Sequence, residues 1–276
     1  MCLAVIAYRF HPNWPIVIVA NRDEFHDRPS TAMHIWNSDP RILAGKDLRA
    51  GGTWLGLNER AQIALLTNVR EPGRFAPDAL SRGKLVESYL LGSEPASQFA
   101  DMSMRSEADY NGYNLLLMDD REAFVISNRP HPNVTRLTPG IHGLSNASLN
   151  TPWPKLTRST EAVRSLFHTL TDPDPQRLIE IMQDDLPPAD PDIPQTGLTP
   201  EREKLLASPF IRSPEYGTRC TTTLMRHRSG KTIVQELRYQ PDGSPFEHSE
   251  WMLSTEGVFS EQAFSQIQDL EHKLNE

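Results

Sequence analysis

The second residue of the chain combines two reactive groups if Met1 is removed. The side chain of Cys2 is small enough to permit that removal, and Cys2 would then carry both a thiol and a free α-amine. The thiolate is the nucleophilic form of cysteine, and an α-amine with a pKa of about 7.7–8.0 accepts protons near neutral pH. One residue could therefore supply nucleophile and base for acyl transfer. The alternative is an inert chain end, as most termini are.

A charged motif follows the second apolar segment of the chain. Asn21-Arg22-Asp23-Glu24 comes directly after residues 15–20. If these residues lie on the hairpin that carries Cys2, an arginine and a carboxylate there could hold the thiolate and the amine in place. The competing interpretation is a solvated turn with a surface ion pair, which contributes about 0–1 kcal/mol to stability.

Three further residues could complete a catalytic site. Asn68 follows an expected strand, and an amide donor at such a position can stabilise an oxyanion. Asn146 has the same potential, and both residues could equally be turn asparagines. Arg219 precedes Cys220 at the start of a late strand and could lower the pKa of a nearby thiol, or it could sit in a structural ion pair. We expect Cys220 itself to be a core residue.

The composition argues against several other classes of function. The nine histidines show no metal-binding spacing, so we expect no metal site and no required cofactor. The net charge of −8 argues against a nucleic-acid partner. No apolar run approaches the roughly 20 residues of a membrane span. The two cysteines imply no disulfide framework and favour a reduced, cytoplasmic compartment.

The elements that must position these residues alternate between strands and helices. Two hairpins with a short strand between them are expected first, then two helices, a pair of strands, a short strand, three more helices, three strands and a closing helix. The strands are expected at residues 3–9, 15–20, 41–44, 53–57, 62–67, 113–118, 123–127, 141–144, 218–227, 232–239 and 246–254. The helices are expected at residues 85–90, 95–105, 154–170, 175–184, 200–207 and 264–274.

This order predicts an α+β fold with antiparallel sheets in layers. The proline-rich stretch 186–199 is too close to the end of the chain to separate two domains, so we interpret it as a long surface loop. Ordered loops of this length are usually functional or lid-like. We therefore expect residues 1–276 to form a single domain.

Four motifs in order resemble those of the NRDE family, which includes the eukaryotic Transport and Golgi organisation 2 protein. The matching segments are Met1-Cys2-Leu3-Ala4, Asn21-Arg22-Asp23-Glu24, Thr67-Asn68-Val69-Arg70 and Tyr216-Gly217-Thr218-Arg219-Cys220-Thr221. They run from the first residue to beyond residue 220, so the resemblance covers nearly the whole chain. That family is in turn similar to the N-terminal-nucleophile hydrolases of the choloylglycine hydrolase and penicillin acylase branch.

The resemblance implies a four-layer αββα sandwich and a role for each matching residue. Cys2 takes the place of the processed nucleophile whose own amine is the base. Asn68 resembles the oxyanion asparagine, Asn146 the asparagine that orients the amine and substrate, and Arg219 the late arginine beside the thiol. Asp23 would help to hold the α-amine.

One departure concerns the order of the charged motif. The branch has an arginine before an asparagine, whereas here Asn21 precedes Arg22. On a strand, a shift of one residue moves a side chain to the other face. The sequence therefore leaves open whether Arg22 faces Cys2, and both Asp23 and Glu24 are candidates for the acid.

Two functions from different classes follow. The first is a cytoplasmic amide hydrolase or acyl-transfer enzyme in which Cys2 attacks a small acylated substrate. The second is a non-enzymatic protein that uses the same cleft to bind haem or an acyl lipid such as acyl-CoA, because the resemblance also implies haem trafficking and lipid handling. The exchanged Arg22 and Asn21, and the loop 186–199, motivate this second reading.

Overall fold

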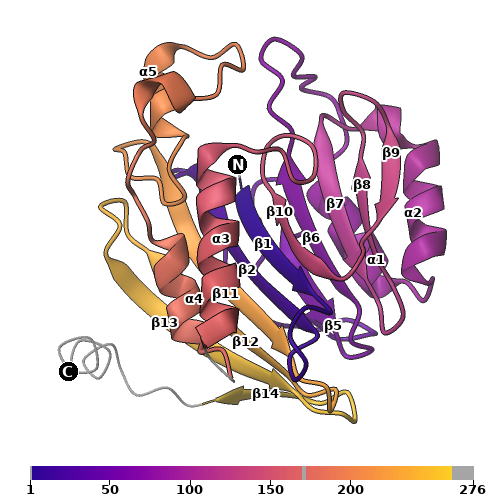
Figure 1. The fold of residues 1–276 in the computed structure, drawn as a ribbon. Helices are drawn as coiled ribbons and strands as arrows, with labels where there is room; N and C mark the ends of the chain where they lie inside the picture. The colour runs from indigo at the N-terminus through magenta and orange to yellow at the C-terminus, as the bar shows by residue number, and fades with distance from the viewer. Residues whose placement is uncertain (1, 170–171, 263–276) are drawn as a thin grey trace.

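The computed structural model describes residues 2–169 and 172–262, which form two stacked antiparallel sheets with helices on the outside (Figure 1). The first sheet has the order β10 (Gly140–Leu144), β1 (Cys2–Tyr8), β2 (Ile16–Phe25), β11 (Tyr216–Arg226), β12 (Thr232–Tyr239), β13 (Pro245–Leu253) and β14 (Phe259–Gln262). The second has the order β3 (His34–Trp36), β4 (Ile42–Ala44), β5 (Leu55–Asn58), β6 (Ile63–Asn68), β7 (Tyr113–Met118), β8 (Ala123–Ser127) and β9 (Asn133–Arg136).

Alternation along β1 explains why it is apolar throughout. Successive side chains of a strand point to opposite faces. Ala4 and Ile6 pack into the core between the two sheets, whereas Leu3 and Val5 pack against the outer helices. Because both faces are covered, the strand reads as one continuous hydrophobic run.

Helices cover the outer face of each sheet. The helices α1 (Gly83–Leu91) and α2 (Ala96–Arg105) pack on the second sheet. The helices α3 (Pro154–Thr169) and α4 (Pro175–Met182) pack on the first sheet, and the short α5 (Pro200–Leu205) lies beyond them at one end (Figure 1). The predicted four-layer αββα sandwich is therefore confirmed.

The largest difference from the predicted elements is the length of β2. The motif Asn21-Arg22-Asp23-Glu24 belongs to the strand itself, because these residues pair with both β1 and β11. The strands β3, β9 and β14 were also not predicted. All four residues of β9 are exposed, so no apolar pattern marks it. The helix expected at 264–274 lies outside the described residues.

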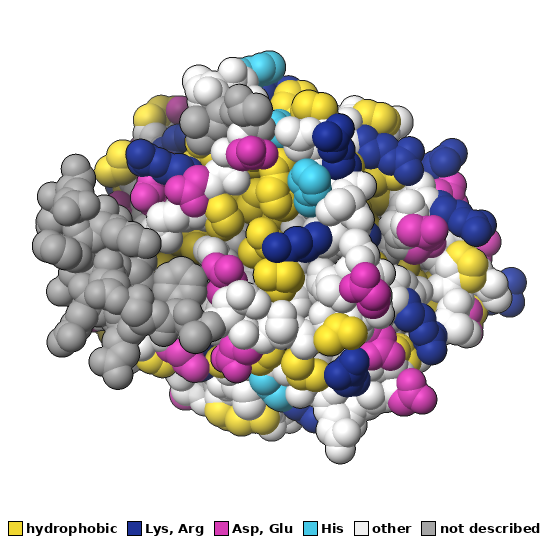
Figure 2. Space-filling view, turned by 90° about the horizontal axis from the view of Figure 1, so that it is seen from below, with side chains coloured by type: hydrophobic (Ala, Val, Ile, Leu, Met, Phe, Trp, Pro, Cys, Tyr) yellow, Lys and Arg dark blue, Asp and Glu magenta, His cyan; other side chains and the backbone are white. Residues whose placement is uncertain are grey.

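The long loop contains a single 3₁₀ turn at Asp190–Asp192 before α5 begins. None of the helices in residues 2–169 and 172–262 has the length and apolarity that a membrane span requires. Figure 2 shows acidic and basic side chains interspersed on the face seen from below.

Candidate active site

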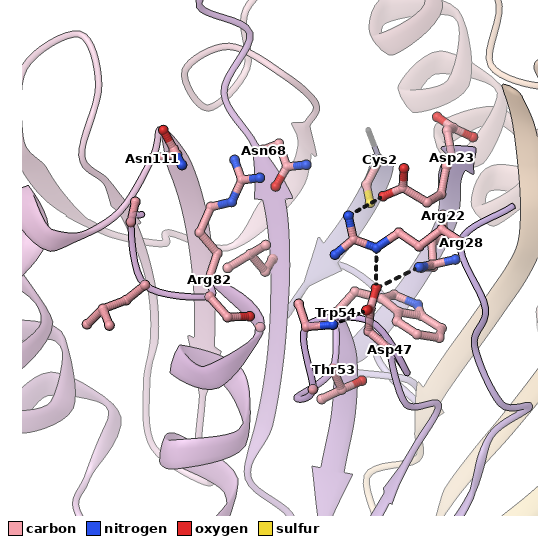
Figure 3. Close-up of a pocket in the computed structure, with 18 of the residues that line it drawn as sticks. Cys2, Arg22, Asp23, Arg28, Asp47, Thr53, Trp54, Asn68, Arg82 and Asn111 are labelled. Carbon is pink, nitrogen blue, oxygen red and sulfur yellow. Dashed lines mark hydrogen bonds and ion pairs between the residues drawn. The ribbon is translucent and has the colours of Figure 1, made fainter. Parts of the chain in front are cut away.

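A cleft of about 200 Å³ lies at one end of the sandwich, where β2 and β6 end and β1 begins (Figure 3). The first sheet contributes Cys2 and part of the charged motif, and the second contributes Asn68. The remaining walls come from the loop after β4 and from the segment that leads into α1. Together with Asn111, residues from six separate parts of the chain therefore meet at this end of the fold.

Arg22 lies directly beside Cys2. The register of β1 and β2 pairs these two residues, so their side chains share the face that looks toward the second sheet. The Arg22 guanidinium lies over the Trp54 ring, 4.4 Å from its centroid, and its Nη2 donates to Asp47 Oδ2 at 3.1 Å. Arg22 therefore faces Cys2, which answers the question that the order of arginine and asparagine in the motif left open.

Asp47 organises the floor of the cleft, although the sequence analysis did not single it out. Its carboxylate accepts hydrogen bonds from Arg28 Nε at 2.7 Å and from the backbone N–H groups of Arg49 and Ala50. Burial alone would raise the pKa of Asp47, but these hydrogen bonds and the neighbouring arginines outweigh it and lower the pKa. Asp47 is therefore ionised and fixes the positions of Arg22 and Arg28.

Asn21 turns the other way and has a structural role. It is buried on the helix side of the sheet, where its Nδ2 donates to the carbonyls of Met182 at 2.8 Å and Pro209 at 3.0 Å. Its Oδ1 accepts from Thr221 Oγ1 at 2.7 Å. Asn21 thus ties β2 and β11 to α4 and to the segment before β11.

Replacing Asn21 with alanine should lower the free energy of unfolding by about 2–4 kcal/mol, because three buried partners lose their hydrogen bonds. Urea denaturation followed by circular dichroism measures this. Asn133→Ala, on the exposed strand β9, is the matched control and should change stability by less than about 0.5 kcal/mol. Equal transition midpoints for the two variants would contradict the assigned role.

Both candidate acids line the cleft, in different environments. Asp23 is buried, and its Oδ1 accepts from Thr218 Oγ1 at 2.8 Å. Burial raises the pKa of Asp23, and the nearby charge of Lys155 acts against that rise. Glu24 accepts a hydrogen bond from the N–H of Phe25 and pairs with Arg28 at 3.6 Å.

The thiol of Cys2 is partly exposed to the cleft. Its pKa is raised above the ordinary value because burial disfavours the thiolate, and the Arg22 charge and the backbone of Asp23 offset this only in part. The thiol is therefore protonated at neutral pH, and a nucleophilic attack requires a base to remove the proton.

Asn68 faces Cys2 from the opposite wall (Figure 3). Its side-chain amide makes no hydrogen bond within residues 2–169 and 172–262, so both of its amide N–H groups are available to a ligand. Its backbone carbonyl accepts from Asn146 Nδ2 at 2.9 Å, and the N–H of Arg70 donates to the Asn146 carbonyl at 2.8 Å. The end of β6 is thus held firmly while the Asn68 side chain stays free.

Asn146 is not among the residues that line the cleft. It is buried at the end of β10, and its neighbour Ser145 joins the two sheets: Ser145 Oγ donates to the Cys2 carbonyl at 3.3 Å, and the Ser145 carbonyl accepts from Thr67 Oγ1 at 2.6 Å. Asn114 Nδ2 donates to the Ala147 carbonyl at 2.9 Å. Segment 145–147 thus connects the strand of the nucleophile to that of Asn68.

Arg219 also lies away from the cleft lining. It occupies an irregularity in the pairing of β11 with β2, and its Nη1 donates to the carbonyls of Phe25 and His26 at 3.0 and 2.9 Å. Its neighbour Cys220 is buried, as expected, and pairs with Arg22 on the side opposite to Cys2. Arg22 therefore separates the two thiols.

Lys155 is a buried cation that was not predicted from the sequence. A lysine that follows Pro154 in the first turn of a helix is expected to be exposed to solvent. Its side chain is fully buried, and Nζ makes no hydrogen bond within the described part of the chain. Burial lowers the pKa of Lys155 to about 8, while Asp23 and Cys2 act to raise it. Lys155 therefore carries a poorly solvated charge near the candidate acid.

This lowered pKa makes the stability of the protein depend on pH. Below pH 8 the cost of burying the charge is fully present, and it disappears as the pH rises toward 10.5, where the unfolded lysine also loses its proton. Between these pH values the wild type should gain about 2–3 kcal/mol in unfolding free energy relative to Lys155→Met. Urea denaturation at several pH values measures this, and a constant difference between the two proteins would contradict it.

The described residues contain no group of three or more histidine, cysteine or acidic side chains arranged to hold a metal ion. What they bring together is a thiol, a free amide donor, a buried acid and several arginines. Such a set can perform acyl transfer without a metal.

Comparison with known proteins finds similar sequences and a similar fold over most of the chain. The family model described as Transport and Golgi organisation 2 matches residues 1–241. The Transport and Golgi organization 2 homolog of Mus musculus is 33% identical over 256 residues, covering 85% of this chain and 92% of that protein. The Homo sapiens homolog is 33% identical over 259 residues, with the same coverage.

Among solved structures, the mutant C2A conjugated bile acid hydrolase from Clostridium perfringens is similar in fold. The TM-score is 0.53 at 8% sequence identity, and the match covers 96% of this chain and 98% of that one. At this identity the likeness shows the fold of an N-terminal-nucleophile hydrolase.

Proposed function

The chain belongs to the Transport and Golgi organisation 2 family, and from this premise we propose that it is a Cys2-dependent hydrolase or acyltransferase that acts on a small acylated substrate. The observation that carries the proposal is the placement of Cys2 and the free Asn68 amide on opposite walls of one cleft (Figure 3). The cleft of about 200 Å³ suits a small acyl group, since drug-sized ligands take about 300–1,000 Å³.

In the proposed reaction, removal of Met1 frees the α-amine of Cys2. The amine accepts the thiol proton as Sγ attacks the amide carbonyl, and a tetrahedral oxyanion forms. The C–N bond then breaks, the proton passes to the leaving nitrogen, and a thioester remains on Cys2. Water attacks the thioester, releases the carboxylic acid and returns the proton to the thiol. With an amine in place of water, the same site would transfer the acyl group.

The raised pKa of the Cys2 thiol supports a mechanism with an internal base. A thiol that stays protonated at neutral pH contains little reactive thiolate. A base must therefore remove the thiol proton during the attack. The α-amine is attached to the same residue and has the right ordinary pKa, about 7.7–8.0. Asp23 is buried and directly follows Arg22, which pairs with Cys2. Asp23 would hold that amine.

Each remaining residue then has a defined task. Asn68 donates to the oxyanion, and Asn146 acts as a positioning residue because it binds the Asn68 carbonyl. Arg22 keeps positive charge beside the sulfur, and Glu24 holds Arg28. Arg219 fixes the end of β2 through the carbonyls of Phe25 and His26.

Intact-protein mass spectrometry and peptide-resolved alkylation test the proposal together. We expect Met1 to be absent from the purified protein, and we expect acetylation of the α-amine to shift the pH profile of Cys2 alkylation to higher pH, because the adjacent positive charge that favours the thiolate is lost. A protein that retains Met1 in most molecules lacks the base and would rule out this mechanism.

The alternative function is non-enzymatic binding of haem or an acyl lipid in the same cleft. The acyl-lipid version is favoured by two exposed apolar side chains at the rim, Phe75 and Leu80. The described lining contains no histidine, so a haem iron would have to be bound through Cys2. Cys2→Ala separates the alternatives, because it should leave acyl-lipid binding intact while it removes turnover. A cytoplasmic location is part of the proposal, since both cysteines are unpaired.

A further inference from the structure

Lys155 is a buried lysine that the proposed mechanism does not use. It is the second residue of α3, and its neighbour Leu156 belongs to the same core cluster as Leu3 of β1. Leu156 also lies against Gly143 of β10, where an added Cβ atom would be only 2.5 Å from Leu156 Cγ. The first turn of α3 therefore lies directly on the sheet, beside the start of β1 (Figure 1), and holds the Lys155 side chain inside the protein.

The charged groups that face Lys155 come from four other segments. Asp23 on β2 and Cys2 on β1 act on it from the side of the cleft, and Arg70, which follows β6, acts on it from a small cavity with no room for a water molecule. The charge of Arg70 is matched by Glu203 of α5, because Arg70 Nη1 donates to Glu203 Oε2 at 2.7 Å. Asp23 is therefore the acid that balances Lys155.

The same carboxylate lies where the freed α-amine of Cys2 would be. The register pairs Cys2 with Arg22, and antiparallel strands run in opposite directions, so the N-terminal end of β1 points toward Asp23, the next residue of β2. Tyr216 on β11 donates its hydroxyl to the Asp23 carbonyl at 2.9 Å and stays neutral, because burial raises its pKa well above the ordinary value. The amine and Lys155 would thus share one carboxylate.

This sharing decides how tightly the amine holds a proton. If Asp23 faced the amine alone in a buried site, the two groups would keep the proton as an ammonium and a carboxylate, and the amine could not accept the thiol proton. The ammonium of Lys155 supplies the balancing charge instead. Although burial lowers the pKa of Lys155 to about 8, the lysine still carries its charge at neutral pH.

We propose that Lys155 is a positioning residue for the reaction at Cys2: its charge, acting through Asp23, keeps the α-amine unprotonated and able to act as the base at neutral pH. During the attack the thiol proton passes to the amine, and Asp23 then stabilises the ammonium that forms. Lys155 keeps its own proton throughout. The inference rests on the proposed function and adds to it a residue that lies outside the cleft lining.

Selective labelling tests the inference without a substrate. The chain has two cysteines, so labelling with [¹³C]cysteine gives two sets of NMR signals, and the Cys2 set is the one lost in Cys2→Ala. The Cα and Cβ shifts of this set follow the ionisation of the amine and of the thiol. We expect the amine pKa in Lys155→Met to lie at least about one unit above that of the wild type, a tenfold gain in proton affinity, because the balancing charge is gone. An equal or lower amine pKa overturns the inference.

Lys84→Met is the matched control. Lys84 follows Gly83 of the cleft wall, but its side chain is 51% exposed and paired with Glu87. Because solvent screens an exposed charge, this variant should move the amine pKa by less than about 0.2 units. A shift as large as that in Lys155→Met overturns the inference.

A double variant tests the route through Asp23. In Asp23→Asn the buried Lys155 has lost its acid and should be neutral at about pH 7, so adding Lys155→Met should no longer change the amine pKa. A full shift in the Asp23→Asn background overturns the inference. If Lys155→Met does not fold, the wild type decides: its amine pKa should lie below the ordinary value of about 7.7–8.0, and a higher pKa overturns the inference.

Hydrolysis of acyl p-nitroanilides separates this inference from the proposed function. In Lys155→Met, kcat at about pH 7 should fall about tenfold with KM unchanged, and it should approach the wild-type value above about pH 9, where the amine is neutral in both proteins. Hydrolysis with identical pH profiles supports the enzyme and overturns the inference. If the wild type hydrolyses no anilide while the amine pKa still depends on Lys155, the proposed hydrolysis fails and the inference stands. A retained Met1 overturns both.

Discussion

Replacing Cys2 with alanine is expected to lower kcat/KM for amide hydrolysis by at least about 10³-fold, because the variant has neither a nucleophile nor an alternative thiol in the cleft. The measurement is the release of p-nitroaniline from a panel of acyl p-nitroanilides of increasing chain length. The fold should be unaffected, since Cys2 is the first residue of β1 and its side chain is partly exposed.

Cys220→Ala is the matched control for this result. Cys220 pairs with the other side of Arg22 and is buried away from the cleft. Its loss should leave kcat/KM within about threefold of the wild type, although it will cost some stability as a core truncation. Equal losses in the two variants would show that turnover does not depend on the Cys2 thiol as such.

Removing the free amide of Asn68 should have the second largest effect. Asn68→Ala is expected to lower kcat by about 10²–10³-fold with little change in KM, because the amide acts on charge that develops only after attack. Single-turnover kinetics with the most reactive anilide of the panel measure this effect. A rise in KM with unchanged kcat would instead assign Asn68 to ground-state binding.

Alkylation provides an internal control for the Asn68 variant. The reaction of a thiolate with iodoacetamide forms no oxyanion, so its rate at Cys2 should be nearly the same in Asn68→Ala and in the wild type. A parallel loss of alkylation and hydrolysis would mean that Asn68 supports Cys2 itself. Asn68→Asp, which has the same shape but no amide donor, should be at least as inactive as the alanine variant.

The layered fold could be predicted because its signals are local. Apolar runs such as residues 3–7 mark strands whose two faces are both covered, and the 85–90 stripe marks a helix that packs on one sheet. Short turns between them imply antiparallel pairing. The strand β9 escaped prediction because all its side chains are exposed, so the alternation that identifies strands is absent.

The charged motif was harder to interpret because its partners are distant in sequence. Four polar residues after an apolar run look like a turn, yet Asn21 and Arg22 are almost fully buried within β2. They are tolerated there because Met182, Pro209 and Asp47 provide hydrogen bonds from segments 25–188 residues away. A single sequence carries no record of those contacts.

The cleft residues that were missed illustrate the same limit. Arg82 and Trp54 occur in segments with no motif of their own, and only the stacking of the sheets brings them to Cys2. Asp47 had a weak signal, since the turn that follows it contains Gly51 and Gly52, both with positive φ. At Gly52 a Cβ atom would come within 2.6 Å of the Gly83 backbone, so this loop must approach α1 closely.

The few hydrogen bonds of segment 145–147 have a consequence for how such a protein can diverge. The sulfur of Cys2 belongs to the first sheet and the amide of Asn68 to the second. Segment 145–147 sets the spacing between them. Helices and distant hairpin turns can therefore be lengthened, shortened or rebuilt over evolutionary time while the reacting pair keeps its alignment. An insertion of one residue within segment 145–147 would misalign Cys2 and Asn68, even if the melting temperature of the protein hardly changed.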